Sequence, residues 1–550
     1  TRRPMQADVL EAARSAFPKS ASITLGAVVH GGECAPEPIA AIPLAMMNRH
    51  GLIAGATGTG KTKSLQLIAE QLSNAGVPVL VSDVKGDLSG LGAPGEPGER
   101  IDQRARDTGY AWRPAAAPVE LLSLSGKLGA QLRATVSSFG PMLLAKVLGL
   151  NETQTSVLTL VFKFCDDRGL LLLDFPDLRA VLRYLSDEGA DELKEYGGMS
   201  KQTVGVLLRE MVELEAQGAE DFFGEPEFDL DDLMQTERDG RGLISVLELR
   251  DVQDRPAMFS TFMLWMLARL YGQLPEVGDV DKPKLVFFFD EAHLLFDGAS
   301  KALLAQIEQT VRLIRSKGVG VFFVTQSPKD VPPDVLGQLG HRVQHALRAF
   351  TEDDDTALRA AARTFPKTSF YDIEETLTTL GIGEAFVTTL ATNGVPTQPF
   401  AVRMVPPASR MGPLTDAELQ QRVSTSVQVK KYAEDIDRQS AREMLEDRAA
   451  PAAAQPQAAP PPPPPAPGQY QYDYQRQQAE AAAAPPQYQY QRQAPEQPKG
   501  RGRAPREEPG MFEKVLKSGV ARSVATQVTR GLMGALLGTP SRRRRRGGLW

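Results

Sequence analysis

The sequence is poor in cysteine and in long apolar runs. Its 550 residues include two cysteines, Cys34 and Cys165, which are far apart and have no metal-ligand spacing. Two isolated thiols in a chain of this length are typical of a reducing compartment, and we expect both to be small core residues. The best apolar run, Leu170–Phe175, is far shorter than the roughly 18 residues of a membrane span, and no apolar run opens the chain. A cytoplasmic location is therefore expected.

Positive charge is scarce in the body of the chain and concentrated in its last residues. Residues 499–550 contain 13 Lys/Arg and 3 Glu, a net charge of +10, whereas the remainder contains 49 Lys/Arg and 65 Asp/Glu, a net charge of −16. The body also lacks a basic stripe with interleaved aromatic residues, the usual sign of a nucleic-acid surface. This asymmetry suggests a tail with a partner of its own.

Composition divides the chain into several regions. Residues 449–510 are rich in Ala, Pro and Gln, including Pro460–Pro465, and cannot bury a core. The expected organisation is an N-terminal β segment (1–47), a first part of an α/β core (48–129), an α-helical insertion (130–235), a second core part (236–407), charged helices (408–448, over 416–423 and 427–446), a disordered linker (449–510), and an amphipathic helix with a basic tail (511–550).

Short, continuously apolar segments alternate with helical patterns in the two core parts. The strands expected on this basis are 52–54, 77–83, 285–290 and 319–325. Strands of this kind are typical of a parallel sheet that helices cover on both faces. The fold class is therefore α/β with a mainly parallel sheet.

A glycine-rich segment follows the first of these strands. Residues 55–62 match G-x-x-x-x-G-K-[ST] in full, with an apolar strand before them and an amphipathic helix, 61–74, after them. Such glycines let backbone N–H groups approach phosphates, while the Lys reaches the β/γ-phosphates and the Thr hydroxyl coordinates Mg²⁺. The sequence therefore predicts a nucleoside triphosphate site at Gly55, Ala56, Thr57, Gly58, Thr59, Gly60, Lys61 and Thr62.

Acidic residues end the strand expected over 285–290. A carboxylate at the carboxyl edge of a parallel sheet lies where such sheets bind ligands. Asp290 is suited to hold Mg²⁺ through water, and Glu291 is the candidate general base that activates the attacking water. A Glu at this position favours hydrolysis over phosphate transfer to a hydroxyl.

Two further features have an alternative explanation that the residues leave open. Gln326 follows the strand 319–325, where its amide can orient water beside the γ-phosphate, or it is a polar turn residue before Pro328. Arg312 and Arg315 share a helix face. One of them can act as an arginine finger in a neighbouring subunit, or both simply complement the helix dipole.

Together these motifs resemble the HerA/FtsK superfamily of hexameric P-loop motor ATPases. More closely, the chain is similar to the HerA-like bacterial branch typified by YjgR. The matching stretches span most of residues 20–450 and are Asn48–Thr62, Asp83–Ser89, Leu170–Phe175, Phe222–Pro226, Lys284–Phe296, Ile314–Gly320 and Leu336–Thr351.

The resemblance implies a RecA-like core that binds ATP and Mg²⁺ and assembles as a homohexamer. It implies that Lys61 and Thr62 contact phosphate and Mg²⁺, that Asp290 and Glu291 serve metal binding and catalysis, and that Gln326 is a sensor. It also implies that Arg312 or Arg315 crosses a subunit boundary. Asp83 resembles an acidic position near the nucleotide.

The sequence leaves open two hypotheses about what the ATPase acts on. Fold and family favour a ring that moves DNA, as a translocase or helicase does. The acidic body favours an ATP-dependent scaffold or switch that moves no polymer. Apolar residues recur every four positions from Phe512 to Leu536, and Arg542–Arg546 follow. This amphipathic helix can dock on protein, lie on an anionic membrane surface or hook nucleic acid.

Overall fold

The computed structural model describes residues 5–17, 20–194, 196–253, 255–278, 280–297, 301–434, 436 and 438–453. Residues 1–448 form one compact unit. None of the helices in the described part of the chain is both long and apolar enough to cross a membrane.

A 12-stranded sheet organises this unit, in the order β2-β1-β12-β11-β10-β3-β9-β8-β4-β7-β5-β6. The strands are β1 Ser22–His30, β2 Glu33–Pro43, β3 Gly51–Ala54, β4 Val79–Asp83, β5 Val119–Ser123, β6 Ala130–Gln131, β7 Ile244–Glu248, β8 Leu285–Phe289, β9 Val319–Thr325, β10 His341–His345, β11 Glu384–Thr388 and β12 Phe400–Met404. From β10 to β6 every neighbouring pair is parallel, and β11, β12, β1 and β2 are added antiparallel. The α/β fold with a mainly parallel sheet is confirmed.

The N-terminal β segment is part of this sheet. Strands β1 and β2 pair as a hairpin, and β1 pairs with β12, which lies more than 370 residues later in the chain. These two strands are nine and eleven residues long. Helix α1 packs against β2.

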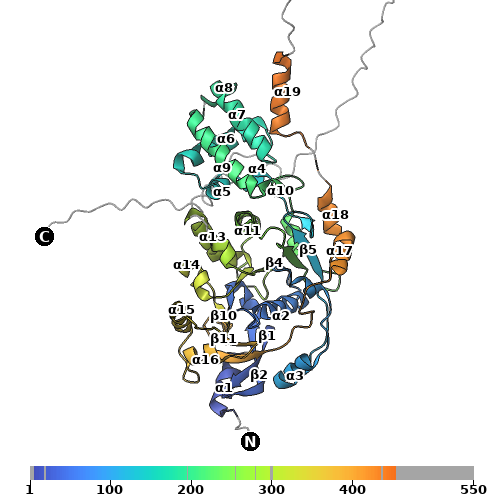
Figure 1. Ribbon diagram of the computed structural model, residues 1–550, viewed down its shortest axis with the longest axis vertical. Helices are drawn as coiled ribbons and strands as arrows, with labels where there is room; N and C mark the ends of the chain where they lie inside the picture. The colour runs from blue at the N-terminus through green and yellow to red at the C-terminus, as the bar shows by residue number, and fades with distance from the viewer. Residues whose placement is uncertain are drawn as a thin grey trace, which may run out of the picture. The chain divides into compact units, whose positions relative to one another are not determined.

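Helices cover both faces of the parallel strands (Figure 1). The helices are α1 Ala7–Ala16, α2 Lys61–Asn74, α3 Glu99–Thr108, α4 Val136–Phe139, α5 Pro141–Val147, α6 Glu152–Arg168, α7 Phe175–Ser186, α8 Ala190–Lys194, α9 Lys201–Ala216, α10 Ala219–Phe222, α11 Pro256–Gln273, α12 His293–Phe296, α13 Lys301–Ile314, α14 Pro333–Leu336, α15 Glu352–Arg363, α16 Ile373–Thr379, α17 Asp416–Thr425, α18 Val427–Ala433 and α19 Ala441–Ala453. In β8, Phe287 and Phe289 pack with α11 and α13, whereas Val286 and Phe288 face the core around α2. This alternation explains why the strand is apolar throughout.

The α-helical insertion begins at Val136, a few residues after the expected boundary at 130, because Ala130–Gln131 still form an edge strand of the sheet. Helices α5 to α9 gather at one end of this unit in Figure 1. Asn151 and Asp174 each begin a helix with a reciprocal capping box, an arrangement that satisfies two orphan backbone donors at a helix start.

The charged helices differ from expectation. The helix expected over 427–446 is interrupted between Ala433 and Ala441. Just before the second helix, the N–H and the hydroxyl of Ser440 both donate to the carboxylate of Glu443. Helix α19 extends to Ala453, so the first residues of the expected linker are helical, and the second compact unit of the chain begins at Ala449. The rest of the linker, 454–510, and the amphipathic helix and basic tail, 511–550, lie outside the described residues.

The two cysteines are both free thiols. Cys165 is buried in α6, as expected, with 1% of its surface exposed. Cys34, on β2, is only half-buried, so the prediction of a core position was wrong for this residue. The strand β2 lies at the edge of the sheet, which leaves one side of it open.

Candidate active site

The glycine-rich loop lies where the central strands of the sheet end. Gly55 N–H donates to the carbonyl of Thr325 at the end of β9 (3.3 Å), and Ala56 N–H donates to the carbonyl of Ala346 just after β10 (2.9 Å). Strands β9 and β10 are the parallel neighbours of β3. The loop is therefore anchored on both sides at the carboxyl edge of the sheet, where the sequence placed it.

The backbone of this loop has a shape that only glycine adopts readily. Gly55, Gly58 and Gly60 have φ angles of 151°, 77° and 117°, and a Cβ on Gly55 would lie 2.5 Å from the Cβ of His345. Helix α2 begins directly after the loop, at Lys61. The loop amides and the positive end of the α2 dipole thus converge on one space, an arrangement that fits a phosphate chain.

Lys61 is the cation of this space. Its side chain is 9% exposed, and its ammonium donates to the carbonyl oxygens of Gly55 (2.7 Å) and Ala56 (3.2 Å). Burial lowers the pKa of Lys61; the nearby carboxylate of Glu291 opposes this effect and the ammonium of Lys85 adds to it. Phosphate oxygens are better partners for a buried ammonium than two loop carbonyls, because both members of the pair are charged.

Asp290 lies directly after β8 and fits the expected Mg²⁺ position. It is 3% exposed, and its N–H donates to the Ser82 hydroxyl on β4 (3.0 Å). Burial raises the pKa of Asp290 to about 7, with additional contributions from the carboxylates of Glu291, Asp83 and Asp87. Its Oδ2 is buried with no hydrogen-bond partner among the described residues. A buried carboxylate with a spare oxygen and acidic neighbours is suited to a hard divalent cation.

Glu291 is held in a constrained turn beside Asp290. Its φ angle is 49°, which is uncommon for a residue other than glycine. The turn continues with a hydrogen bond from Ala292 N–H to the Val324 carbonyl of β9 (2.9 Å). The Glu291 carboxylate forms an ion pair with the Lys85 ammonium, and its Oε2 lies 3.4 Å from Nδ1 of His293.

Lys85 is a residue of this site that the sequence reasoning missed. Burial alone would lower its pKa, but the hydrogen bond and the charge of Glu291 outweigh burial and raise the pKa of Lys85. Lys85 lies in one of the stretches that match the family, Asp83–Ser89, which was the available signal. No pattern in the sequence, however, indicates that this turn after β4 reaches the end of β8.

Asp83 shapes the turn that carries Lys85. Its Oδ1 accepts from the Gly86 N–H and its Oδ2 from the Leu88 N–H, both at 2.7 Å. Burial raises the pKa of Asp83 to about 6 despite these two bonds. Both carboxylate oxygens are thus used within the turn, and the expected contact between Asp83 and the nucleotide stays a prediction.

His345 is a second residue whose role was missed. It is fully buried at the end of β10, where its Nε2 bonds the Ser64 hydroxyl of α2 (2.9 Å) and its Nδ1 bonds the Glu384 carbonyl (2.8 Å). Burial lowers the pKa of His345 to about 4, so the ring is neutral at pH 7. His345 therefore braces the first turn of α2 against β11 rather than carrying charge.

Gln326 follows β9, as expected, and lines a cavity of about 640 Å³ beside the loop. The same cavity is lined by Ala56 and Thr57 of the glycine-rich loop and by Lys329. The Gln326 side chain is exposed to this space. Its role in orienting water stays a prediction, and its position beside the loop is compatible with that role.

Arg312 and Arg315 lie away from the loop. Arg312 is in the last turn of α13, and Arg315 begins the 3-10 turn Arg315–Lys317 that follows. Both side chains line a separate cavity of about 630 Å³, together with Arg49 and Arg342. The residues that line the cavity beside the glycine-rich loop do not include them.

The sequence of the chain matches a known protein family. The sequence model of the family described as helicase HerA-like C-terminal matches residues 32–546. The chain belongs to this family. The resemblance that the motifs predicted is thus confirmed, and the chain is a P-loop ATPase. No curated protein sequence gives a significant match.

Solved structures of conjugation and secretion proteins are similar to the chain at low identity. The unbound form of the bacterial conjugative coupling protein TrwB is 14% identical, with a TM-score of 0.45 over 74% of this chain and 94% of that one. TrwB in complex with ADP and Mg²⁺ is 16% identical, with a TM-score of 0.46 over 74% and 95%. VirB4 of Thermoanaerobacter pseudethanolicus is 15% identical, with a TM-score of 0.44 over 70% and 97%. The family assignment rests on the sequence match alone.

Proposed function

We propose that this HerA-like ATPase hydrolyses ATP with Mg²⁺ and works as a ring-forming motor on DNA. The ATP hydrolysis in this proposal is supported by one observation: three charged side chains lie close together at the carboxyl edge of the sheet. Lys61 of the glycine-rich loop lies within electrostatic range of Asp290 and Glu291 after β8. A phosphate-binding cation opposite two buried carboxylates is the arrangement that metal-assisted phosphate hydrolysis needs.

Each group has a distinct task in this proposal. The loop amides and Lys61 bind the phosphates, and the Thr62 hydroxyl and Asp290 hold Mg²⁺, which neutralises charge that develops on the phosphate oxygens. Glu291 accepts the proton of the attacking water, and the Gln326 amide orients that water. Asp83 keeps the turn that positions Lys85 against Glu291.

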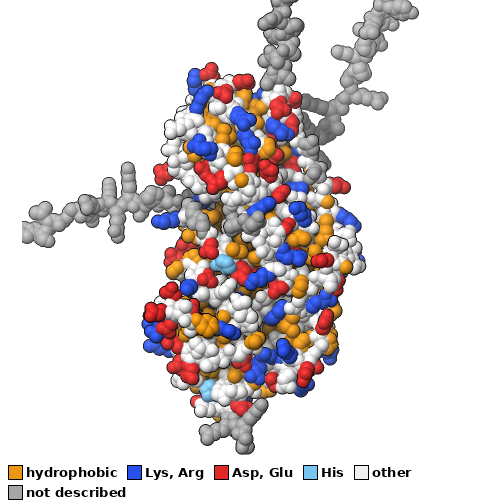
Figure 2. Space-filling model, in the orientation of Figure 1, with side chains coloured by type: hydrophobic (Ala, Val, Ile, Leu, Met, Phe, Trp, Pro, Cys, Tyr) orange, Lys and Arg blue, Asp and Glu red, His pale blue; other side chains and the backbone are white. Residues whose placement is uncertain are grey.

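The polymer is the part of the proposal that needs a direct test. On the face in Figure 2, acidic and basic side chains of the described residues are interspersed, without a large patch of either sign. A ring places its polymer in a central channel, so the surface of one subunit says little about that channel. Family membership is what favours DNA.

We expect duplex or single-stranded DNA to raise the ATPase rate, and the stimulation to weaken steeply as salt rises. Contacts with phosphates release counterions, so an increase from about 50 to 200 mM salt costs orders of magnitude in affinity. The assay compares both DNAs, RNA, a poly-glutamate control of matched charge and no polymer. Equal rates under all conditions at low salt would contradict the motor and favour the alternative, an ATP-dependent scaffold or switch.

We propose a ring, with a hexamer as the expected form, because the arginines lie away from the loop of their own chain. Arg312 and Arg315 line a different cavity from the one beside Ala56 and Gln326. An arginine supplied in trans stabilises transition-state charge and is worth about 10³–10⁵ in rate. The structure thus suggests a site completed by the neighbouring subunit.

Mixing inactive subunits tests this assembly. Arg315→Ala and Glu291→Gln subunits should each be inactive alone and recover part of the activity when combined, because an intact loop then meets an intact arginine. Lys61→Ala mixed with Glu291→Gln is the matched control, since both changes disable the same half of the site and no mixture can repair it. If neither Arg315→Ala nor Arg312→Ala is rescued, or if a monomer has full activity, the assembly in trans is wrong.

The binding partner of the C-terminal tail, which lies outside the described residues, is proposed from its sequence. The helix expected over 511–538 and Arg542–Arg546 combine an apolar stripe with a basic end. Such a segment suits a protein surface or an anionic membrane surface. Within the described residues, α19 contacts the insertion through the bond from Ala441 N–H to the Leu171 carbonyl. We propose that the tail locates or assembles the ATPase and takes no part in its chemistry.

A further inference from the structure

The two carboxylate oxygens of Glu291 have different surroundings. Oε1 accepts a hydrogen bond from the Lys85 ammonium and forms an ion pair with it. Oε2 is buried and has no hydrogen-bond partner among the described residues, and Nδ1 of His293 lies 3.4 Å from it. We propose that Lys85 is a positioning residue for hydrolysis, which holds Oε1 so that Oε2 accepts the proton of the attacking water. This inference rests on the ATPase function proposed above.

The oxygen that Lys85 leaves free lies next to a residue of the cavity beside the glycine-rich loop. That residue, His293, lines the cavity of about 640 Å³ together with Gln326 and Thr57. A general base has to lie within hydrogen-bond reach of the proton that it takes. The contact between Lys85 and Oε1 therefore leaves the second oxygen of Glu291 available to a water molecule in this space.

The backbone of Glu291 is constrained, but its carboxylate can still rotate about the side-chain bonds. The φ angle of 49° and the hydrogen bond from Ala292 N–H to the Val324 carbonyl fix the point at which the side chain begins. The direction of the carboxylate needs a contact of its own, and the Lys85 ammonium donates one. Because a misplacement of about 1 Å at a reacting group can cost about 10²-fold in rate, this orientation matters for turnover.

Lys85 is itself carried by a constrained turn after β4. Gly86 has a φ angle of 79°, and a Cβ on it would lie 2.2 Å from Cδ of Arg250. Leu249 N–H donates to the carbonyl of Asp83 at the start of the turn (2.9 Å). The turn is therefore packed against the segment after β7, and Lys85 reaches Glu291 from a fixed position.

The exposure of the two side chains separates orientation from charge. The Lys85 side chain is 53% exposed, whereas that of Glu291 is 7% exposed. Water screens the charge of an exposed ammonium, so its electrostatic effect on the site is small compared with its effect on the direction of the carboxylate. Removal of an exposed side chain also leaves no cavity in the core. A change of rate on replacing Lys85 therefore reports on Glu291 rather than on packing.

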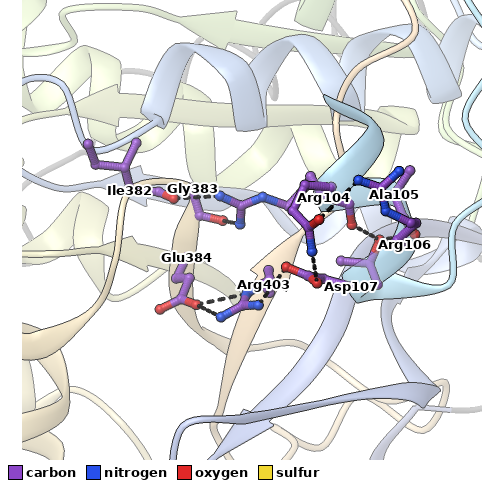
Figure 3. Close-up of polar contacts among 10 residues, drawn as sticks. Arg104, Ala105, Arg106, Asp107, Ile382, Gly383, Glu384 and Arg403 are labelled. Carbon is purple, nitrogen blue, oxygen red and sulfur yellow. Dashed lines mark hydrogen bonds and ion pairs between the residues drawn. The ribbon is translucent and has the colours of Figure 1, made fainter. Parts of the chain in front are cut away.

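The glycine-rich loop is fixed from a different direction. Gly383 N–H donates to the Thr59 carbonyl of the loop (2.9 Å). The Arg104 guanidinium of α3 donates in turn to the carbonyls of Gly383 (3.1 Å) and Ile382 (2.8 Å), as Figure 3 shows. These contacts hold the loop independently of Lys85. We therefore expect a substitution at Lys85 to leave phosphate binding intact.

Replacing Lys85 with methionine in the full chain tests the inference. Methionine keeps an apolar stem and removes the ammonium. The kcat for ATP should fall by about ten- to a hundredfold, while KM and the dissociation constant of Mg·ADP should change by less than about twofold. Phosphate release in the presence of Mg²⁺ and duplex DNA measures kcat and KM, and titration calorimetry measures binding. The melting temperature checks that the variant is folded.

Two further variants serve as controls. Lys85→Arg retains a cationic donor and should recover most of the rate. Lys127→Met replaces an exposed lysine in the loop after β5, at the same edge of the sheet, and should change neither kcat nor KM. If Lys85→Arg is as slow as Lys85→Met in a folded protein, a donor at this position does not suffice, and the positioning role is wrong.

A double variant shows whether Lys85 acts through Glu291. Lys85→Met combined with Glu291→Gln should be no slower than Glu291→Gln alone, because the group that Lys85 positions is already absent. Losses that multiply would contradict the inference, as would an unchanged or raised kcat in Lys85→Met. A rise in KM that accounts for the whole loss would make Lys85 a phosphate ligand instead. In each of these cases the ATPase function stands; an unmodified protein that hydrolyses no ATP would overturn both.

Discussion

Replacing Glu291 with glutamine should slow steady-state ATP hydrolysis by about 10²-fold or more while nucleotide binding persists. The amide has nearly the shape of the carboxylate but cannot accept the proton of the attacking water, and a general base is worth about 10²–10⁴ in rate. Phosphate release measures the loss in kcat, and calorimetry with Mg·ADP measures binding.

The change also removes the ion pair between Glu291 and Lys85, so folding needs its own readout. The melting temperature of Glu291→Gln should stay close to that of the unmodified protein, and Glu213→Gln on exposed α9 should have no effect on either rate or melting. Unmodified kcat in a folded Glu291→Gln protein would remove this residue from the mechanism.

Replacing Lys61 with alanine should abolish turnover and weaken nucleotide binding together. The ammonium is buried and, among the described residues, donates hydrogen bonds to two carbonyl oxygens of its own loop, those of Gly55 and Ala56. It is therefore positioned to exchange these for phosphate oxygens. Removal of one donor aimed at developing charge costs about 10²–10³ in kcat, and the lost ground-state contact adds a rise in KM.

The control for this change is Lys430→Ala on the exposed side of α18, which should leave both constants unaltered. Folding is checked by the melting temperature, which need not fall, since removal of a buried charge is often neutral or stabilising. Normal KM and kcat in Lys61→Ala would contradict the assignment of the loop as a phosphate site.

The glycine-rich loop and its strands could be predicted from the sequence because their signals are local. The spacing of residues 55–62 and the apolar segment before Asp290 are each contained within a short stretch. Burial on both faces makes β8 apolar throughout, and that pattern is specific enough to indicate a parallel sheet. The positions of the glycine-rich loop and of the acidic pair after β8 therefore follow from motifs alone.

The other half of the sheet depends on contacts between distant segments. The pairing of β1 with β12 joins residues more than 370 positions apart, and no pattern in either strand indicates its partner. For the same reason, the sequence did not indicate the ion pair between Lys85 and Glu291, nor the hydrogen bonds by which His345 holds the start of α2. Each of these residues has an ordinary neighbourhood in the sequence and acquires its role only through the fold.

The interruption after Ala433 was missed for a different reason. Charged residues with helical spacing continue through residues 427–446, so periodicity alone favours one long helix. In the structure, Tyr432 is buried and its hydroxyl bonds Asp232 of the insertion (2.6 Å). Packing of α18 against this region ends that helix, and local capping at Ser440 starts the next. Tertiary contact outweighs helix propensity here.

Steady-state phosphate release from ATP by the full chain, with Mg²⁺ and with excess EDTA, tests the central claim most directly. With duplex DNA present in both arms, we predict turnover in Mg²⁺, none in EDTA, and full recovery when Mg²⁺ is restored. That result follows if Lys61, Thr62, Asp290 and Glu291 form one metal-assisted site. Turnover that EDTA leaves unchanged, or no turnover by a folded and assembled protein in Mg²⁺, would contradict it.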